Sequence, residues 1–286
     1  MLISQRMIIR PVEEEDQKQL ANLIHFENHV HRHLDWRTPL EWIGRQPFLV
    51  AEADKRIVAA LACPPDPPGV AWIRLFAVGG SQPLQKSWQD LWQEAVARLN
   101  QLDEIEWSVA IPLWKWFREL IEGSGFQENN RVVMLNWDRG NALPRTTQTG
   151  IKIRAMNLDD IKIVHRLDSD SFDPVWRVSL QTLNHSLKLS VISTIAELDR
   201  QVVGYQISTS TTMGGHLARL AVSPEVQGQG IGYALICDLL NKFDQRGAER
   251  ITVNTQKDNH ASLKMYRKSG FKLSGDEYPV YVYALN

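Results

Sequence analysis

A glycine-rich segment is the part of the sequence whose residue types point most directly to chemistry. Glycine occupies positions 228, 230 and 232, between an apolar run at 217–222 and a second apolar run at 233–243. Because glycine has no Cβ and tolerates positive φ, several backbone N–H groups of such a loop can converge on one anion. A helix that starts after the loop would add the positive end of its dipole. The segment therefore predicts a phosphate-binding loop.

Two common nucleotide loops do not match this segment. The phosphate loop of nucleoside triphosphatases places Lys and then Ser or Thr after its last glycine, whereas Gly232 is followed by Tyr233 and Ala234. A dinucleotide fingerprint needs a third glycine where Tyr233 stands and an acidic residue where Asn254 stands. The sequence therefore disfavours both kinds of loop.

A third kind of loop fits. Gln227, Gly230 and Gly232 follow the pattern Q-x-x-G-x-G after a strand, which resembles the acetyl-CoA pyrophosphate loop of the GNAT superfamily of N-acetyltransferases. Downstream, the run 259–271 reads N-x-x-S-x-x-x-Y-x-x-x-G-F and resembles the second signature of that family. The two motifs at this separation make the resemblance specific for residues 151–286.

The resemblance implies a binding site for acetyl-CoA as a co-substrate. It implies that strand 217–222 splays from the strand at 250–254, so that backbone groups of the first strand stay free to bind the cofactor. Asn259 would begin the next helix, where a role as N-cap is already a sufficient explanation. The expected acetyl-CoA contacts are Leu220, Ala221, Val222, Gln227, Gly228, Gln229, Gly230, Ile231, Gly232 and Asn259.

Tyr266 is the first candidate catalytic residue. It matches the tyrosine with which the family protonates or hydrogen-bonds the departing sulfur. Thiols have an unperturbed pKa of about 8.5 against about 10 for tyrosine, so this proton should change the rate by a modest factor. The alternative is a core tyrosine, because Tyr266 stands three residues after Leu263 on an amphipathic helix.

His216 is the candidate base. It stands eleven residues before Gln227, where several members of the family carry a catalytic glutamate. A histidine with an ordinary pKa of about 6.5 could accept a proton from an amine at neutral pH. A water chain, or a half-exposed histidine at a strand end without a catalytic role, remains an equal alternative. Glu197 is a reserve candidate, but its match to Glu52 in the first half indicates a structural role.

The chain compared with itself shows one unit used twice. The segments 8–12 and 51–59 recur as 152–156 and 196–204, displaced by 144 to 145 residues. Such a repeat predicts two domains, 1–138 and 151–286, joined by a linker at 139–150 that contains glycine and proline. The resemblance implies that each is a mixed, mostly antiparallel twisted sheet flanked by helices, an α/β (α+β) fold.

The first copy lacks the glycine loop. Aligning the copies replaces Gln227, Gly230 and Gly232 by Pro83, Lys86 and Trp88. Nine of the ten tryptophans lie in this half. Bulky side chains either enlarge a core in place of a ligand cleft, which we favour, or line an acceptor surface.

Composition sets further expectations. The 286 residues suit two domains, and 43% apolar with 23% charged residues are typical of a globular protein. No signal peptide or long apolar run is visible, and a net charge of -1 gives no nucleic-acid footprint, so we expect a cytoplasmic protein without nucleic-acid or membrane partners. Cys63 and Cys237 have no C-x-x-C partner and should be buried and reduced.

A histidine cluster raises the question of a metal. His25, His29, His31 and His33 lie near Asp35 in the first copy. No catalytic partner accompanies them, and a solvated connection between helices explains them, so we expect no metal site.

These observations predict an N-acetyltransferase whose C-terminal domain moves the acetyl group of acetyl-CoA to a primary amine of a small molecule or peptide. Residues 171–176 and 276–278 are plausible walls of the acceptor site. The alternative is a non-catalytic acyl-CoA sensor or interaction module. The sequence leaves the acceptor, the acyl chain and the oligomeric state open.

Overall fold

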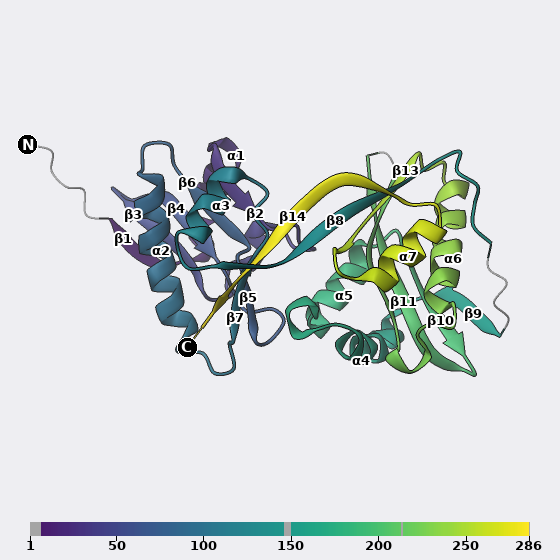
Figure 1. The fold of residues 1–286 in the computed structure, drawn as a ribbon. Coiled ribbons are helices and arrows are strands. Elements are labelled where there is room, and N and C mark those ends of the chain that lie inside the picture. Colours follow the sequence, from purple (N-terminus) through teal and green to yellow (C-terminus); the bar gives the residue numbers. More distant parts are fainter. Residues whose placement is uncertain (1–6, 146–149, 213, 286) are drawn as a thin grey trace, which may run out of the picture. The chain divides into compact units, whose positions relative to one another are not determined.

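The computed structural model describes residues 7–145, 150–212 and 214–285. The described chain forms two compact units, and each carries helices on sheets of mixed or antiparallel strands (Figure 1). This arrangement confirms the expected fold class.

The elements of unit 1 in chain order are β1 (Ile8–Pro11), α1 (Gln17–Phe26), β2 (His29–Arg32), β3 (Phe48–Ala53), β4 (Arg56–Ala62), β5 (Val70–Trp72), β6 (Leu75–Val78), α2 (Leu84–Leu99), β7 (Trp107–Ala110) and α3 (Lys115–Glu122), with 3-10 turns η1 (Glu14–Asp16) and η2 (Pro39–Trp42). Five strands form an antiparallel sheet in the order β1-β3-β4-β6-β2. The short strand β5 pairs parallel to β7.

The elements that follow are β8 (Gln127–Asp138), β9 (Ile151–Ala155), η3 (Leu158–Asp160), α4 (Ile161–Ser171), η4 (Pro174–Trp176), α5 (Leu180–Leu189), β10 (Ile192–Leu198), β11 (Gln201–Thr211), β12 (Gly214–Val222), η5 (Pro224–Val226), α6 (Ile231–Gln245), β13 (Arg250–Gln256), α7 (His260–Lys268) and β14 (Lys272–Ala284). The sheet of unit 2 has the order β8-β13-β12-β11-β10-β9, and only the β12–β13 pair is parallel. Helix α6 follows β12 and helix α7 follows β13, the two strands of this parallel pair (Figure 1).

The compact units have different bounds from the predicted domains 1–138 and 151–286. Unit 1 takes in the described residues up to Asn129 and those from Pro279 onward, whereas unit 2 is Asn130–Tyr278. The difference comes from the last strand of each half. In unit 2, β8 pairs with β13, and in unit 1 the end of β14 pairs with β7.

An arginine-centred ion cluster anchors the first strand of unit 1. Arg10 donates to Asp16 at 2.7 Å and to Glu52 at 2.8 Å, which ties β1 to η1 and to β3. The hydrogen bonds from Arg10 hold the pKa of Asp16 below its ordinary value. The cluster therefore fixes the start of the fold in this unit.

Unit 2 repeats the same cluster with its own residues. Arg154 donates to Asp160 at 2.7 Å and to Glu197 at 2.8 Å. These hydrogen bonds likewise hold the pKa of Asp160 below its ordinary value. The repeat detected in the sequence is thus a repeat of contacts, and Glu197 is engaged in the same structural ion pair as its counterpart Glu52.

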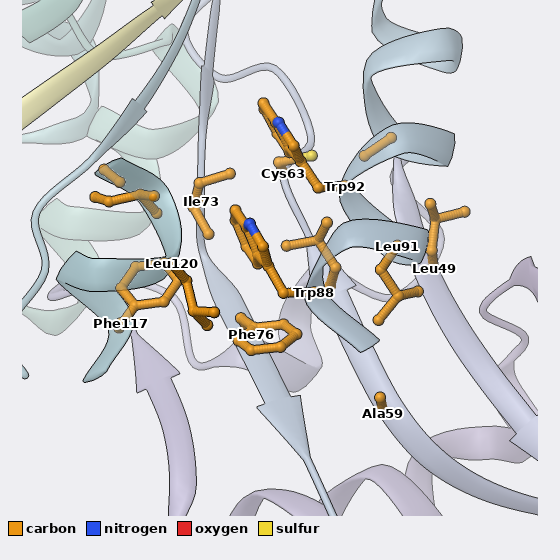
Figure 2. Packing of buried hydrophobic residues seen from close by; sticks show 14 of the residues in the cluster. Leu49, Ala59, Cys63, Ile73, Phe76, Trp88, Leu91, Trp92, Phe117 and Leu120 are labelled. Atoms are coloured by element: carbon orange, nitrogen blue, oxygen red, sulfur yellow. The ribbon is translucent and has the colours of Figure 1, made fainter. Parts of the chain in front are cut away.

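Aromatic side chains fill unit 1 at the place where the chain, between β5 and β6, parts from β7. The pairing with β7 ends at Ile73, whose N–H donates to the carbonyl of Val109 at 2.8 Å. Beyond that point Trp88 of α2 packs edge-on to Phe76 and Phe117, with ring centroids 5.0 and 5.5 Å apart (Figure 2). Trp88 is 0% exposed, which confirms the interpretation that it enlarges the core of the first copy.

We expect the Arg154→Met variant to lower the free energy of unfolding by about 1–3 kcal/mol at pH 7, because the buried carboxylate of Asp160 loses its charge-assisted hydrogen bonds. The folded-state pKa of Asp160 is depressed, so this stability is present above the unfolded pKa of about 4 and is lost as pH falls through the folded pKa. Urea denaturation at pH 7 and in acid measures both effects. The control is Lys152→Met, which removes an exposed ammonium 3.9 Å from Glu197 and should change little. If Arg154→Met loses as much stability in acid as at pH 7, the stabilising role of the Arg154–Asp160 ion pair is contradicted.

Trp88→Ala should lower the free energy of unfolding by about 3–5 kcal/mol, because a buried indole leaves a large cavity. The matched control is Trp114→Ala, since Trp114 is 60% exposed and its loss should cost under about 1 kcal/mol. Urea denaturation followed by circular dichroism compares the two variants. Equal losses would show that Trp88 does not fill the core in solution.

Candidate active site

The sheet of unit 2 opens between its two parallel strands. The ladder between β12 and β13 runs from Gly214 opposite Arg250 to Leu217 opposite Val253 and extends no further. On its other side β12 remains paired with β11 as far as Val222. The splay implied by the sequence is therefore present, and the backbone groups of 218–222 that face β13 have no strand partner.

A cavity of about 610 Å³ occupies this opening. Its walls are the second half of β12, the glycine-rich loop with the first turn of α6, the second half of β13, and α7. The end of α4 and the turn η4 form a further wall through Ser171, Phe172 and Trp176. The cavity thus joins the predicted cofactor loop to one of the two predicted acceptor walls.

The glycine loop has the backbone that its sequence predicts. Gly228 and Gly230 have φ of +80° and +85°, in the left-handed region that favours glycine. Gly230 is the N-cap of α6, so the N–H groups of the first turn lie at the loop and have no partner within the helix. Gln227 donates from Nε2 to the carbonyl of Val222 at 3.0 Å, which ties the loop to the end of β12. This end of α6 suits an anion.

Gly232 permits a close approach of α6 to α7. A Cβ at this position would lie 2.8 Å from the Sδ of Met265. Trp88 is the residue aligned with it in the first copy, where the indole fills the core. A side chain at 232 would therefore displace Met265 from the wall of the cavity.

Most of the predicted cofactor contacts lie around this cavity. Gln229 is the exception, because it is exposed and is not part of the wall. Asn259 lines the cavity and also accepts a hydrogen bond from the N–H of Ser262 at 3.0 Å, so it serves as the N-cap of α7. The predicted contacts on the wall are Leu220, Ala221, Val222, Gln227, Gly228, Gly230, Ile231, Gly232 and Asn259.

Tyr266 is both a core residue and a wall residue. It is 5% exposed, its ring lies 5.7 Å from that of Phe271, and it borders the cavity. Burial raises the pKa of Tyr266 above the ordinary value for tyrosine. The phenol therefore stays protonated at neutral pH, as a proton donor must.

His216 lies on β12 but is not part of the cavity wall. Its Nδ1 is 2.8 Å from the Oγ1 of Thr252. Burial lowers the pKa of His216, and a hydrogen bond with Asn254 acts in the opposite direction. Asn254 does line the cavity, so the imidazole is one residue removed from it.

The other side chains considered from sequence lie elsewhere. Glu197 is held by Arg154 and does not border the cavity, and the predicted wall 276–278 does not border it either. Cys63 and Cys237 are buried free thiols, as expected. In the described ranges no three His, Cys, Asp or Glu side chains form a group that could hold a metal ion.

A buried charge cluster beside the cavity was not predicted. Arg219 of β12 donates to Asp168 of α4 from Nε at 2.5 Å and from Nη2 at 2.9 Å. The hydroxyl of Tyr205 also donates to Asp168, and burial raises the pKa of Tyr205 so that this donor stays protonated. A signal existed in the sequence, because Asp168 stands seven residues after Ile161 on the apolar face of α4 and therefore needed a buried partner.

Within the described ranges, none of the helices combines the length and the apolar character that crossing a membrane requires.

Known proteins resemble this chain in two ways. A protein of Bacillus subtilis (strain 168) named "Putative ribosomal protein bS18-alanine N-acetyltransferase" is 24% identical over 130 residues, which are 45% of this chain and 85% of that protein. The crystal structure of a GCN5-related N-acetyltransferase from Sphaerobacter thermophilus matches with a TM-score of 0.65 at 16% identity, covering 100% of this chain and 98% of that one.

A tandem GNAT protein from the clavulanic acid biosynthesis pathway matches with a TM-score of 0.68 at 14% identity, covering 98% of this chain and 99% of that one. At these identities the structures show that the whole chain shares the tandem fold. The model of the acetyltransferase (GNAT) family matches residues 161–271, which contain both sequence signatures and most of the cavity wall. This segment of unit 2 is therefore similar to the acetyltransferase (GNAT) family of acyltransferases.

Proposed function

We propose that unit 2 transfers an acetyl group from acetyl-CoA to a primary amine of a small molecule or peptide. The observation that carries the proposal is the cavity between the splayed strands β12 and β13, with the glycine-rich loop at the start of α6 in its wall. Unit 1 has tryptophan where this wall needs glycine and serves as a scaffold.

The shape of the opening supports acetyl-CoA as the donor. The N–H groups at the start of α6 suit the pyrophosphate, because they are unpaired and carry the positive end of the helix dipole. The free backbone edge at 218–222 suits the amide groups of the pantetheine arm, which can pair with it as a strand would. Both features border one cavity, so one elongated ligand can reach them together.

The chemistry requires two proton transfers. The amine nitrogen bonds to the thioester carbonyl carbon, the C–S bond breaks, the nitrogen loses a proton and the sulfur gains one. We assign the proton on the sulfur to Tyr266, which borders the cavity and is protonated at neutral pH. Free backbone N–H groups of β12 can stabilise the charge that develops on the carbonyl oxygen.

The base remains a choice between His216 and water. The depressed pKa of His216 keeps its imidazole neutral at pH 7, as a base requires. Because His216 lies off the cavity wall, a proton from the amine would reach it through the neighbourhood of Asn254 or through a water. A water chain alone would serve the same purpose.

The position of His216 also favours a second candidate, a non-catalytic acyl-CoA sensor. Such a protein would need the same loop and cleft but no base on the wall. Release of free thiol from acetyl-CoA in the presence of an amine separates the two functions, because a sensor binds acetyl-CoA without releasing thiol.

We expect calorimetry to give one acetyl-CoA site per chain, and Gly230→Lys to abolish it, because a side chain at positive φ closes the approach to the N–H groups of α6. The matched control is Gly275→Lys, which also places lysine at a positive φ, +96°, with open space around it. This control should keep its affinity. Full binding by the Gly230→Lys protein contradicts the site, and two sites per chain contradict the scaffold role of unit 1.

Tyr266→Phe should lower kcat by about tenfold to a hundredfold and leave acetyl-CoA affinity nearly unchanged, because it removes a proton donor to a good leaving group. The raised pKa of Tyr266 places any loss of rate from its ionisation above about pH 10. Thiol release across an amine panel measures the rate, with Tyr278→Phe, off the cavity wall, as the control. Equal rates in wild type and Tyr266→Phe overturn the role.

A further inference from the structure

The guanidinium of Arg219 is fixed at the edge of the cavity. Its side chain is 12% exposed and borders the cavity, and its Cζ lies 3.9 Å from the centroid of the Phe172 ring. Asp168 accepts from Nε and Nη2, and the carbonyl of Trp176 accepts from Nη2 at 2.8 Å. The hydrogen bonds to Asp168 and Trp176 and the packing against the Phe172 ring therefore hold the guanidinium in one orientation.

One nitrogen of this guanidinium has no partner in the protein. An arginine carries five N–H donors, of which two belong to Nη1. Within the described ranges nothing accepts a hydrogen bond from Nη1 of Arg219, although Nε and Nη2 are fully engaged. Nη1 is not among the fully buried atoms that lack a partner, so it keeps some accessible surface, and the residue that carries it lines the cavity.

Unit 1 provides an internal comparison. Arg74, at the junction of β5 and β6, also pairs with an aspartate, but both of its Nη nitrogens are engaged by the protein itself. Nη1 donates to Asp35 at 2.8 Å and Nη2 donates to the carbonyl of Asp66. The nitrogen of Arg74 that lacks a partner is Nε, which is fully buried, whereas the unpaired nitrogen of Arg219 is Nη1, which is not among the fully buried atoms.

A carboxylate is the group that suits Nη1 best. Hydrogen bonds from a guanidinium to a carboxylate are charge-assisted and stronger than those to a neutral carbonyl, and partial burial strengthens them further. Such a ligand would not take the partners of Asp168, which also accepts from Tyr205 and from the N–H of Val178 at 3.4 Å. Arg219 can therefore bind a second carboxylate while Asp168 keeps its hydrogen-bond donors.

We propose that the acceptor of this enzyme is a small amine that also carries a carboxylate, as an amino acid does, and that Nη1 of Arg219 binds this carboxylate beside Phe172 and Trp176. The inference rests on the proposed function and adds the class of acceptor to it. Lys264 and Lys268 also border the cavity, but both lie on α7, and the Nζ of Lys268 lies 4.3 Å from the centroid of the Tyr233 ring.

The first test uses the unmodified protein and matched substrates. Each amino acid of a panel is compared with its carboxamide and with the amine that lacks the carboxyl group, and thiol release from acetyl-CoA gives kcat/KM. We expect kcat/KM for the best carboxylates to exceed that for their carboxamides by at least tenfold, mainly because KM is lower. Turnover of carboxamides at equal or higher kcat/KM overturns the inference and leaves the proposed function standing.

A binding measurement keeps the inference testable if no amine is turned over. Calorimetric titration of N-acetylated amino acids and of their carboxamides into the CoA-loaded protein reads recognition of the carboxylate directly. At least tenfold tighter binding of the carboxylates supports the inference even where the absence of thiol release overturns the proposed function. Equal affinities overturn the inference.

Variants assign the preference to one residue. Arg219→Lys keeps a positive charge but loses the planar array of N–H donors. This variant should lose most of the preference for carboxylates and still bind acetyl-CoA normally. If this variant does not fold, the double change Asp168→Asn with Arg219→Gln removes both buried charges together and should have the same effect on preference. Tyr205→Phe is the control, because it removes a donor to Asp168 but leaves Nη1 in place. A folded variant without the guanidinium that retains the full preference contradicts the assignment to Arg219.

Discussion

The parting of β12 from β13 after Leu217 is the constraint on which the other features of the site depend. Parallel strands that separate inside a sheet leave backbone N–H and C=O groups without partners, and such groups cost free energy unless something else binds them. The two units differ in what lies beside the place where the strands part. In unit 2 a cavity of about 610 Å³ lies along the free edge, and the glycine loop, α7 and the end of α4 surround it.

Unit 1 shows what the same frame becomes when side chains occupy the space. The ion clusters around Arg10 and Arg154 match contact for contact, so the early part of each unit is set by the same interactions. The units diverge at the aligned position that is Trp88 in unit 1 and Gly232 in unit 2. An indole at the first position gives a densely packed core, whereas the absence of a side chain at the second lets α6 approach Met265 of α7 and keeps the cavity open.

Local motifs identified residues of the cavity wall better than a position on a strand did. The glycines, the N-cap Asn259 and Tyr266 follow from short spacings along one loop and one helix, and all of them border the cavity. His216 was inferred from a position on a strand, where the direction of a side chain depends on pleat and bulge. The register of β11 and β12 shifts beside it, and the imidazole lies off the wall, against Thr252.

Residue types at short separations were enough to identify the repeated α/β unit, the glycine-rich loop and the copy that carries it. Which strand completes each sheet depends on the tertiary structure, since β8 and β14 are both long strands with an exposed first part and buried residues in the second part. The tertiary structure also decided that Asp168, Tyr205 and Arg219, distant in sequence, form one buried cluster beside the cavity. Long-range pairing of charges depends on the packing of α4 against β12, which no local spacing encodes.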